Sequence, residues 1–212
     1  MARAGSYLGN GTNGAYLYAA QYELGSYATS YIPSYGTAAT RIADVCNGAG
    51  TAATFNDSEG VLFFEGSALT DDGASRRISI SSGVVSNRVV IIYQTSGRVD
   101  YQVRSGNLFQ AGGFGSATQT NNNKIAVKYK ANDFALWING IEVATDSSGS
   151  TPIGINQMRF EDGNGGNDFY GNVNQVLTFN TALTDLEIET LTSYTSWTAM
   201  VNALNLNIIN NV

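Results

Sequence analysis

The stretch from Thr51 to Thr178 is a series of short β-prone segments separated by turn signals, and it restricts the fold more than any other feature. The segments recur roughly every ten residues without a helical pattern between them, which favours an antiparallel sandwich over a parallel sheet. The expected strands cover residues 60–69, 76–82, 88–95, 98–105, 107–114, 123–131, 133–145, 155–163 and 168–179.

The strongest hairpin signal is Asn139-Gly140, which lies between "FALWI" and "IEVAT". A type I′ turn needs positive φ at both central residues, and Asn and Gly accept this conformation at little steric cost. The chain contains 24 glycines and only 13% of its residues are charged. This composition suits many tight turns between strands.

The hydrophobic period changes after the last expected strand. Thr184 and Glu187 form the pattern of a capping box, which predicts that a helix begins there. A second short helix is expected over about residues 197–204. The apolar residues of the first helix recur at close to helical spacing: they are Leu183, Leu186, Ile188 and Leu191.

The N-terminal residues follow a different pattern. Alternation in "GAYLYAAQYELG" predicts a strand within residues 14–25. In the next segment, Pro33 removes a ladder donor and pushes Ile32 toward an extended conformation. We therefore expect a strand and an extended connector over residues 1–45, a sandwich over 46–182, and a helix with a tail over 183–212.

Charge and composition argue against several classes of protein. The net charge of −6 disfavours binding to nucleic acid, which depends on clustered Lys and Arg. No apolar run approaches the ~20 residues that cross a bilayer, and the N-terminus lacks the apolar stretch of a signal peptide. We expect neither a nucleic-acid partner nor a membrane span.

The sequence offers no recognisable catalytic set. Glycoside hydrolases need two carboxylates that flank the scissile bond, but Glu65 stands alone and Glu187 and Glu189 lie on the expected helix. A lyase could use Tyr101, between Arg98 and Arg104, as its base, but the chain has no histidine to assist it. The expected protein is not an enzyme.

The loop "FEDGNGGNDF", residues 160–169, is the best candidate for a metal site. Asp162, Asn164 and Asp168 supply hard oxygens at short spacing, and the glycines would let the backbone wrap around calcium. The spacing is not that of an EF-hand. A glycine-rich hairpin turn explains the same residues without a metal.

A sugar site needs an aromatic platform beneath a pyranose ring and planar polar groups for its hydroxyls. Asn139 and Asn167 are candidate polar partners. The alternation of "FALWI" leaves open whether the Trp137 ring faces solvent or the core. The candidate platforms are Trp137, Tyr93, Tyr101 and Tyr170.

Two segments resemble the concanavalin A-like lectin/glucanase superfamily in its laminin-G-like branch. They are "FALWINGIEVAT" and "FYGNVNQVLTFNTALTDLEIETL", and Thr178 is more polar than the family pattern. The resemblance implies an all-β jelly roll, a sandwich of antiparallel strands. The pattern falls on Gly171, Val173, Val176, Thr178, Phe179, Ala182, Leu183 and Thr184.

Two further segments resemble bacteriophage tail and fibre proteins. They are "GSYATSYIPSYGTAATRIADV" and "SYTSWTAMVNALNLNII". The resemblance implies a homo-oligomeric virion module that contacts other virion proteins and binds a host-surface or environmental glycan. Two alternatives remain, a purely architectural virion protein and a glycan-cleaving enzyme of the same fold.

Overall fold

The computed structural model describes residues 20–22, 31–33, 35–39 and 49–204 of the 212-residue chain. The chain divides into two compact units, Met1–Asp44 and Val45–Val212. The described residues of the first unit form neither helix nor strand, and there the Ile32 backbone N–H donates to Gln21 Oε1 at 2.7 Å. Of the strand predicted within 14–25, residues 20–22 are described and are not in a strand; the rest of it and most of the predicted connector lie outside the described residues.

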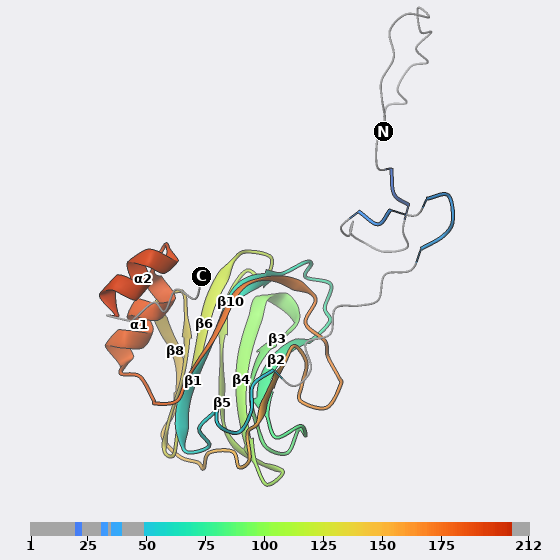
Figure 1. Ribbon diagram of the computed structural model, residues 1–212. Helices are drawn as coiled ribbons and strands as arrows, with labels where there is room; N and C mark the ends of the chain where they lie inside the picture. Colours follow the sequence, from blue (N-terminus) through green and yellow to red (C-terminus); the bar gives the residue numbers. More distant parts are fainter. Residues whose placement is uncertain (1–19, 23–30, 34, 40–48, 205–212) are drawn as a thin grey trace, which may run out of the picture. The chain divides into compact units, whose positions relative to one another are not determined.

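The described part of the second unit is a sandwich of two antiparallel five-stranded sheets (Figure 1), which confirms the predicted fold class. The strand orders are β10-β1-β6-β7-β8 and β5-β4-β3-β2-β9. A short 3-10 turn, Thr95–Gly97, joins β3 to β4. The strands are β1 Glu59–Ala68, β2 Arg76–Ser81, β3 Arg88–Tyr93, β4 Arg98–Ser105, β5 Leu108–Ser116, β6 Asn123–Lys130, β7 Asp133–Ile138, β8 Ile141–Asp146, β9 Gln157–Arg159 and β10 Gly171–Phe179.

The predicted hairpin is present between β7 and β8. Asn139 and Gly140 have φ values of 51° and 85°, as a type I′ turn requires. The Asn139 side chain accepts from the Lys124 backbone N–H at 2.9 Å and donates to Asn123 Oδ1 at 3.0 Å. These contacts tie the turn to the neighbouring strand β6.

The core between the sheets is built by alternate residues of facing strands. In β1, Leu62 and Phe64 belong to this core, whereas Val61 and Phe63 point to the other side of the sheet. All four side chains are fully buried. The run "VLFF" is therefore apolar on both faces, and the outer face of its sheet needs a cover.

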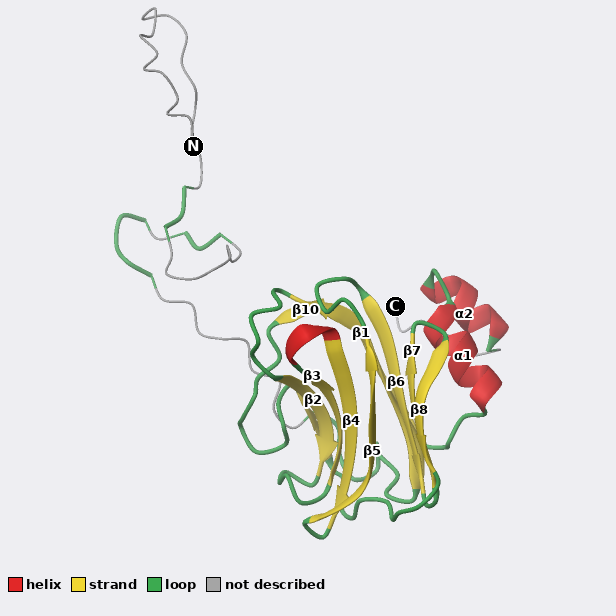
Figure 2. Cartoon of the chain, turned by 180° about the vertical axis from the view of Figure 1, so that it is seen from behind, coloured by secondary structure: helices red, strands yellow, loops and turns green. Residues whose placement is uncertain are grey.

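Two helices provide that cover, α1 at Asp185–Ser193 and α2 at Trp197–Ala203. They pack on the outer face of the β10-β1-β6-β7-β8 sheet, which we call the closed face, while the other sheet lies on the opposite side (Figures 1 and 2). The predicted capping box is present at Thr184 and Glu187. Neither helix has the length and apolarity that a membrane-spanning helix needs. The buried apolar residues between the helices and this sheet are Val61, Phe63, Ala126, Ala135, Trp137, Ile188, Leu191, Met200 and Val201.

An ion pair fastens the first helix to the closed face. Lys128 Nζ lies 2.8 Å from Asp185 Oδ1, in the first turn of α1, and 2.8 Å from Asp133 Oδ1, at the start of β7. Burial alone lowers the pKa of Lys128, but the hydrogen bonds that its ammonium donates to Asp133 and Asp185 outweigh burial and raise that pKa above its ordinary value. Lys128 therefore remains a cation between helix and sheet.

The two sheets meet closely along the edge where β5 passes β8. Gly113 points inward there, and a Cβ at this position would lie only 2.5 Å from the Ala144 Cβ. Glycine at this inward position of β5 therefore allows the two edge strands to approach each other. The outer face of the β5-β4-β3-β2-β9 sheet carries no helix in the described part of the chain, and we call it the open face.

Candidate functional site

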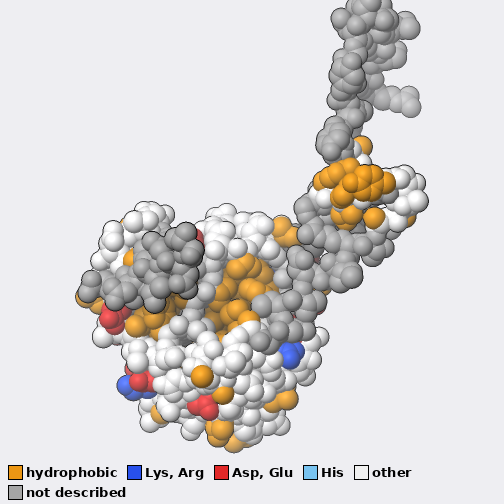
Figure 3. Space-filling model, in the orientation of Figure 1, with side chains coloured by type: hydrophobic (Ala, Val, Ile, Leu, Met, Phe, Trp, Pro, Cys, Tyr) orange, Lys and Arg blue, Asp and Glu red, His pale blue; other side chains and the backbone are white. Residues whose placement is uncertain are grey.

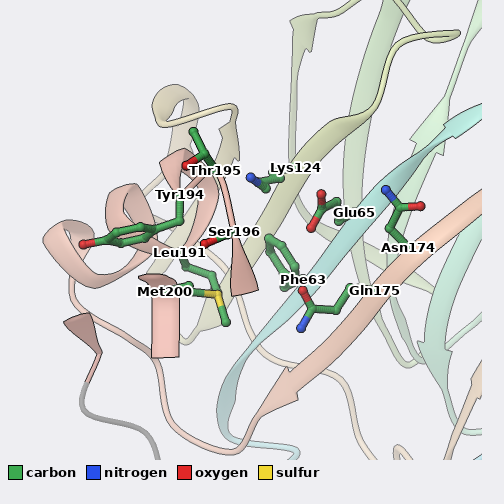
Figure 4. A pocket seen from close by; sticks show the side chains of 10 residues that line it. All are labelled: Phe63, Glu65, Lys124, Asn174, Gln175, Leu191, Tyr194, Thr195, Ser196 and Met200. Atoms are coloured by element: carbon green, nitrogen blue, oxygen red, sulfur yellow. The ribbon is translucent and has the colours of Figure 1, made fainter. Parts of the chain in front are cut away.

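Each outer face of the sandwich has a hollow in its surface. The hollow beside the helices has a volume of about 370 Å³, and Phe63, Leu191 and Met200 are its apolar lining. Figure 4 shows these side chains facing the polar groups of β1, β6 and β10. In the same orientation as Figure 1, Figure 3 shows apolar side chains at the surface beside the helices. This hollow is thus a gap at the border of the helix-covered cluster.

Two polar side chains that line the gap, Glu65 and Asn174, are linked through Asn122. Asn122 Nδ2 donates to Glu65 Oε1 at 2.8 Å, and Asn174 Nδ2 donates to Asn122 Oδ1 at 3.0 Å. Glu65 is the only carboxylate among the lining residues. The carboxylate of this hollow is therefore already engaged, and its other polar lining includes Lys124 and Gln175.

The hollow on the open face is larger, about 570 Å³, and its chemistry is different. We call it the arginine groove. Its polar lining includes Asp100 and Gln102, which lie between the basic side chains of β4. The groove is defined by Arg77, Arg88, Arg98, Arg104, Phe109 and Phe114.

Strand alternation directs these side chains to the outside. Val99, Tyr101 and Val103 of β4 belong to the core between the sheets, so the residues between them face outward. The same rule places Arg88 of β3 and Arg77 of β2 on the open face, because their neighbours Val89 and Ile78 are core residues. Three adjacent strands therefore present arginine on one surface.

Arg88 is the most enclosed of these arginines. It is 5% exposed, and its Nη1 donates to the Asp162 carbonyl oxygen at 2.5 Å while its Nη2 donates to Gln102 Oε1 at 3.0 Å. Its Nε has no hydrogen-bond partner in the described part of the chain. Burial, followed by the nearby charge of Arg77, lowers the pKa of Arg88 to about 10. The guanidinium therefore stays charged at neutral pH.

Arg104 faces Arg88 across the β3–β4 pair. Its Nε donates to the same Gln102 Oε1 at 2.9 Å, so one amide oxygen accepts from two guanidinium groups. Like charges at directly opposed positions repel each other. The pair therefore forms a concentrated positive region in the groove.

Arg98 marks the other end of the groove and is partly neutralised. Its Nε and Nη2 donate to the two carboxylate oxygens of Asp100 at 2.6 and 3.1 Å. Its guanidinium also lies 4.0 Å from the centre of the Phe114 ring. This end of the groove is an aromatic ring with a fixed ion pair beside it.

Phe109 supplies a second ring at the Arg104 end. It is paired with Arg104 in the β4–β5 register and is 57% exposed. A Cβ at Gly112 would lie 2.8 Å from the Phe109 Cζ, so the ring lies over this glycine. The groove thus has an exposed ring near each end, because Phe114 is 55% exposed.

The loop of residues 160–169 borders β2 and closes on itself. The Asp162 carboxylate accepts from the backbone N–H groups of Asn164 and Gly166 at 3.3 and 3.2 Å, and from Asn167 Nδ2 at 3.2 Å. Arg77 Nη1 lies 3.6 Å from its Oδ2. Glu161 accepts from the backbone N–H of Gly165.

These contacts bear on the calcium site predicted at Asp162, Asn164 and Asp168. Donors already surround the Asp162 carboxylate, and the Tyr170 hydroxyl donates to Asp168 Oδ2 at 3.4 Å. No group of three or more acidic, cysteine or histidine side chains suited to a metal occurs within the described residues. The geometry favours the alternative interpretation, a glycine-rich turn held by its own carboxylates.

The structure does not bring the predicted sugar-binding residues together. Tyr93, Tyr101 and Trp137 are 0%, 2% and 6% exposed, which corrects the expectation that their rings form a platform open to solvent. The first two belong to the core between the sheets, and Trp137 lies beneath the helices. Burial raises the pKa of both tyrosines.

The other predicted residues are exposed but lie apart from the groove. Tyr170 is 50% exposed and Asn167 is exposed in the 160–169 loop, where its φ is 58°. Asn139 belongs to the β7–β8 hairpin, on the other sheet. None of these three residues is part of the arginine groove.

Arg98 and Arg104 were considered only as neighbours of a catalytic Tyr101, and the other groove residues were missed, although part of the signal was present in the sequence. In "RVDYQVRS" the apolar positions Val99, Tyr101 and Val103 alternate with a polar set, so an inward Tyr101 implies outward arginines. The approach of Arg88 and Arg77 to that set depends on the strand order, which the sequence does not specify. Asp100 is the only carboxylate that lines the groove, and it is bound to Arg98.

A scan against protein-family models and a search of curated proteins found no match to this chain. Solved structures with the same fold include the CBM40 of the Ruminococcus gnavus IT-sialidase, with a TM-score of 0.58 and 15% identity over 72% of this chain and 96% of that chain. Another is the leech intramolecular trans-sialidase, with a TM-score of 0.56 and 17% identity over 73% of this chain and 27% of that chain.

A third similar structure is a heptameric SAP-like pentraxin from Limulus polyphemus, with a TM-score of 0.54 and 10% identity. The match covers 72% of this chain and 77% of the pentraxin chain. At such low identities the likeness establishes the fold alone, a lectin-like jelly roll.

Proposed function

We propose that this chain is a non-enzymatic glycan-binding module and that the arginine groove is its binding site. The observation that carries the proposal is the groove itself, in which two exposed rings, Phe109 and Phe114, flank a row of planar polar side chains. Sugar sites combine these elements, because the ring faces accept the apolar side of a pyranose and the polar groups bind its hydroxyls.

The similar structures support this proposal at the level of the fold. One of them is the R. gnavus CBM40 bound to α2,3 sialyllactose. Binding by this chain would be non-covalent, through ring stacking and hydrogen bonds from Gln102, Gln94 and the arginines. Because each contact is weak, several copies on one particle would supply avidity.

The setting that we propose is a virion, where the module is a homo-oligomeric part of a tail, fibre or capsid and contacts other virion proteins. The support is the resemblance of residues 25–45 and 193–209 to segments of phage structural proteins. The competing function is a purely architectural module without a sugar site.

A glycan-array screen of the folded protein tests the function. We expect specific binding that is lost in the double variant Phe109→Ala, Phe114→Ala and kept in Ile141→Ala. Ile141 is a matched control because it is 65% exposed on β8, outside the groove. If the folded parent protein binds no glycan, the architectural alternative is preferred.

A further inference from the structure

We propose that the arginine groove takes an extended chain of carboxylate-bearing sugars, that is, a segment of an acidic polysaccharide. This inference rests on the proposed function, since it names the class of glycan for the same groove. It is distinct from the recognition of one acidic sugar at the end of a chain, because it requires contacts at both ends of the groove.

The charge of the groove is the first argument. Four arginines line it, together with a single carboxylate, Asp100, in a chain whose net charge is −6. Arg88 and Arg104 are directly opposed on neighbouring strands. Arg77, on the next strand, is already paired with Asp162 at 3.6 Å. A bound anion would relieve the repulsion between these cations.

The free hydrogen-bonding capacity of Arg88 is the second argument. Its side chain lines the groove and is 95% buried, since it is only 5% exposed, yet its Nε–H has no acceptor among the described residues. An unpaired donor on a buried cation is costly, and a carboxylate is the group that best satisfies a guanidinium. The Arg88 Nε itself is closed to solvent, so we place one ligand carboxylate beside it, on Arg104, which is partly exposed.

The separation of the two rings is the third argument. Phe109 is paired with Arg104 and Phe114 with Asp100, four residues earlier on β4. The four residues of β4 span about 13 Å, and the Phe109 ring extends back over Gly112, so the distance between the two rings is shorter than this. A chain of several sugars can contact both rings together with the arginines beside them.

The two ends differ in what they offer to such a chain. At one end the Arg98 charge is already matched by Asp100, so the Phe114 ring and the edge of this ion pair suit a stacked sugar. At the other end Arg88 and Arg104 share the single acceptor Gln102 Oε1, which leaves an excess of positive charge. The strongest dependence on the ligand carboxylate is thus expected at Arg104.

Calorimetric titration tests the inference. The acidic probes are oligogalacturonates, alginate oligosaccharides and hyaluronan oligosaccharides of increasing length. The neutral probes are dextran and mannan oligosaccharides together with the methyl-esterified galacturonate hexamer, and α2,3-sialyllactose serves as the terminal acidic sugar. We expect binding to at least one acidic series, with an affinity that rises with length until the chain spans the groove and falls with added salt.

Two variants locate the effect. Arg104→Gln should weaken binding of the acidic oligosaccharide by roughly tenfold or more, the loss of one charge-assisted contact. Lys130→Gln removes the same charge from the other sheet, where Lys130 pairs with Glu59 at 3.1 Å, and should leave the affinity unchanged. The circular dichroism and melting temperature of both variants establish that they are folded.

Three results would overturn the inference while the proposed function stands. They are binding to neutral probes alone, equal affinity for sialyllactose and for the longest acidic probes, and an Arg104→Gln variant that binds like the parent. Equal affinity for single-stranded DNA would show attraction by charge alone and would also overturn it. The absence of binding to every saccharide would overturn the proposed function itself.

Discussion

The closed face and the open face are the outer surfaces of two five-stranded sheets, but only the closed face is covered by helices. On the closed face the central strands direct Phe63, Ala126 and Trp137 outward, and two helices bury these apolar side chains. Charged residues of the same face, such as Lys128, lie among them. On the open face the outward positions of β2, β3 and β4 include Arg77, Arg88 and four polar residues of β4. The chemistry of the outward positions thus determines which face the chain covers.

The open face also shows how a polar surface can rest on an apolar base. Val90 and Ile92 of β3 point outward between the arginines, but they are 0% and 5% exposed. The long stems of arginine cover apolar surface while the charged ends stay available to partners. The groove therefore has a floor of apolar side chains from which solvent is excluded, with charged side chains above it. The closed face has no such arrangement.

The largest effect that separates the two faces is expected for Trp137→Ala. The ring is 6% exposed beneath the helices, and its loss should lower the free energy of unfolding by about 3–5 kcal/mol. Phe114→Ala on the open face, a matched removal of an exposed ring, should change it by less than about 0.5 kcal/mol. Urea denaturation of both variants measures the difference, and equal losses would show that the faces do not differ in this way.

A smaller loss in the free energy of unfolding is expected when the charge of Lys128, which joins α1 to the closed face, is removed. Lys128→Gln removes the cation between Asp133 and Asp185, both exposed, and should cost about 1 kcal/mol of stability. Lys130→Gln, whose side chain is 52% exposed, should cost less than about 0.5 kcal/mol. The same denaturation experiment compares them, and an unchanged Lys128→Gln variant would mean that helix packing alone fastens α1.

A pH-dependent effect of about 0.5 kcal/mol is expected at the start of α1. Hydrogen bonds from the Thr184 backbone N–H and hydroxyl hold the pKa of Glu187 below its usual value. A carboxylate whose pKa is lowered by folding stabilises the fold at every pH above its usual pKa near 4.5. This stabilisation is lost as the pH falls through the lower pKa that the group has in the folded protein.

The measurement is the free energy of unfolding of the parent and of Glu187→Gln between pH 7 and pH 3. The difference between the two proteins should be largest at pH 7 and should shrink toward pH 3. Glu189→Gln, on the same helix but outside the capping box, serves as the control. A difference that does not vary with pH would argue against the Glu187 carboxylate as its source.

The smallest expected effect is that of a chelator. Because backbone and side-chain N–H groups already surround the Asp162 carboxylate, EDTA should leave the melting temperature and any glycan binding unchanged. A lower melting temperature in EDTA, restored by added calcium, would instead support the metal site predicted at Asp162, Asn164 and Asp168.

Local patterns predicted the fold well because the determining signals are local. The Asn139-Gly140 turn and the Thr184–Glu187 cap each depend on a few adjacent residues, and both are present. The run "FALWI" left the environment of Trp137 open, because a continuous apolar run has no polar face to mark the outside. Its cover comes from helices about fifty residues later in the chain, beginning at Asp185.

The groove could not be predicted in the same way. Arg77, Arg88 and Arg104 are separated along the sequence, and they meet only because β2, β3 and β4 are neighbours in a particular register. Four aromatic residues were predicted as sugar platforms, but three of them, Tyr93, Tyr101 and Trp137, are buried. The exposed rings Phe109 and Phe114 lie on the edge strand β5, where the glycine-rich segment gave no clear periodicity.

The hydrogen bonds within the arginine groove have a consequence for the thermodynamics of association. Each of Arg88, Arg98 and Arg104 is already held by an acceptor of the protein. A free arginine side chain that becomes fixed on binding loses roughly 0.5–1.5 kcal/mol of conformational freedom. Here most of that ordering accompanies folding, so a ligand meets side chains that are already in place, and little of its binding energy is spent on immobilising them.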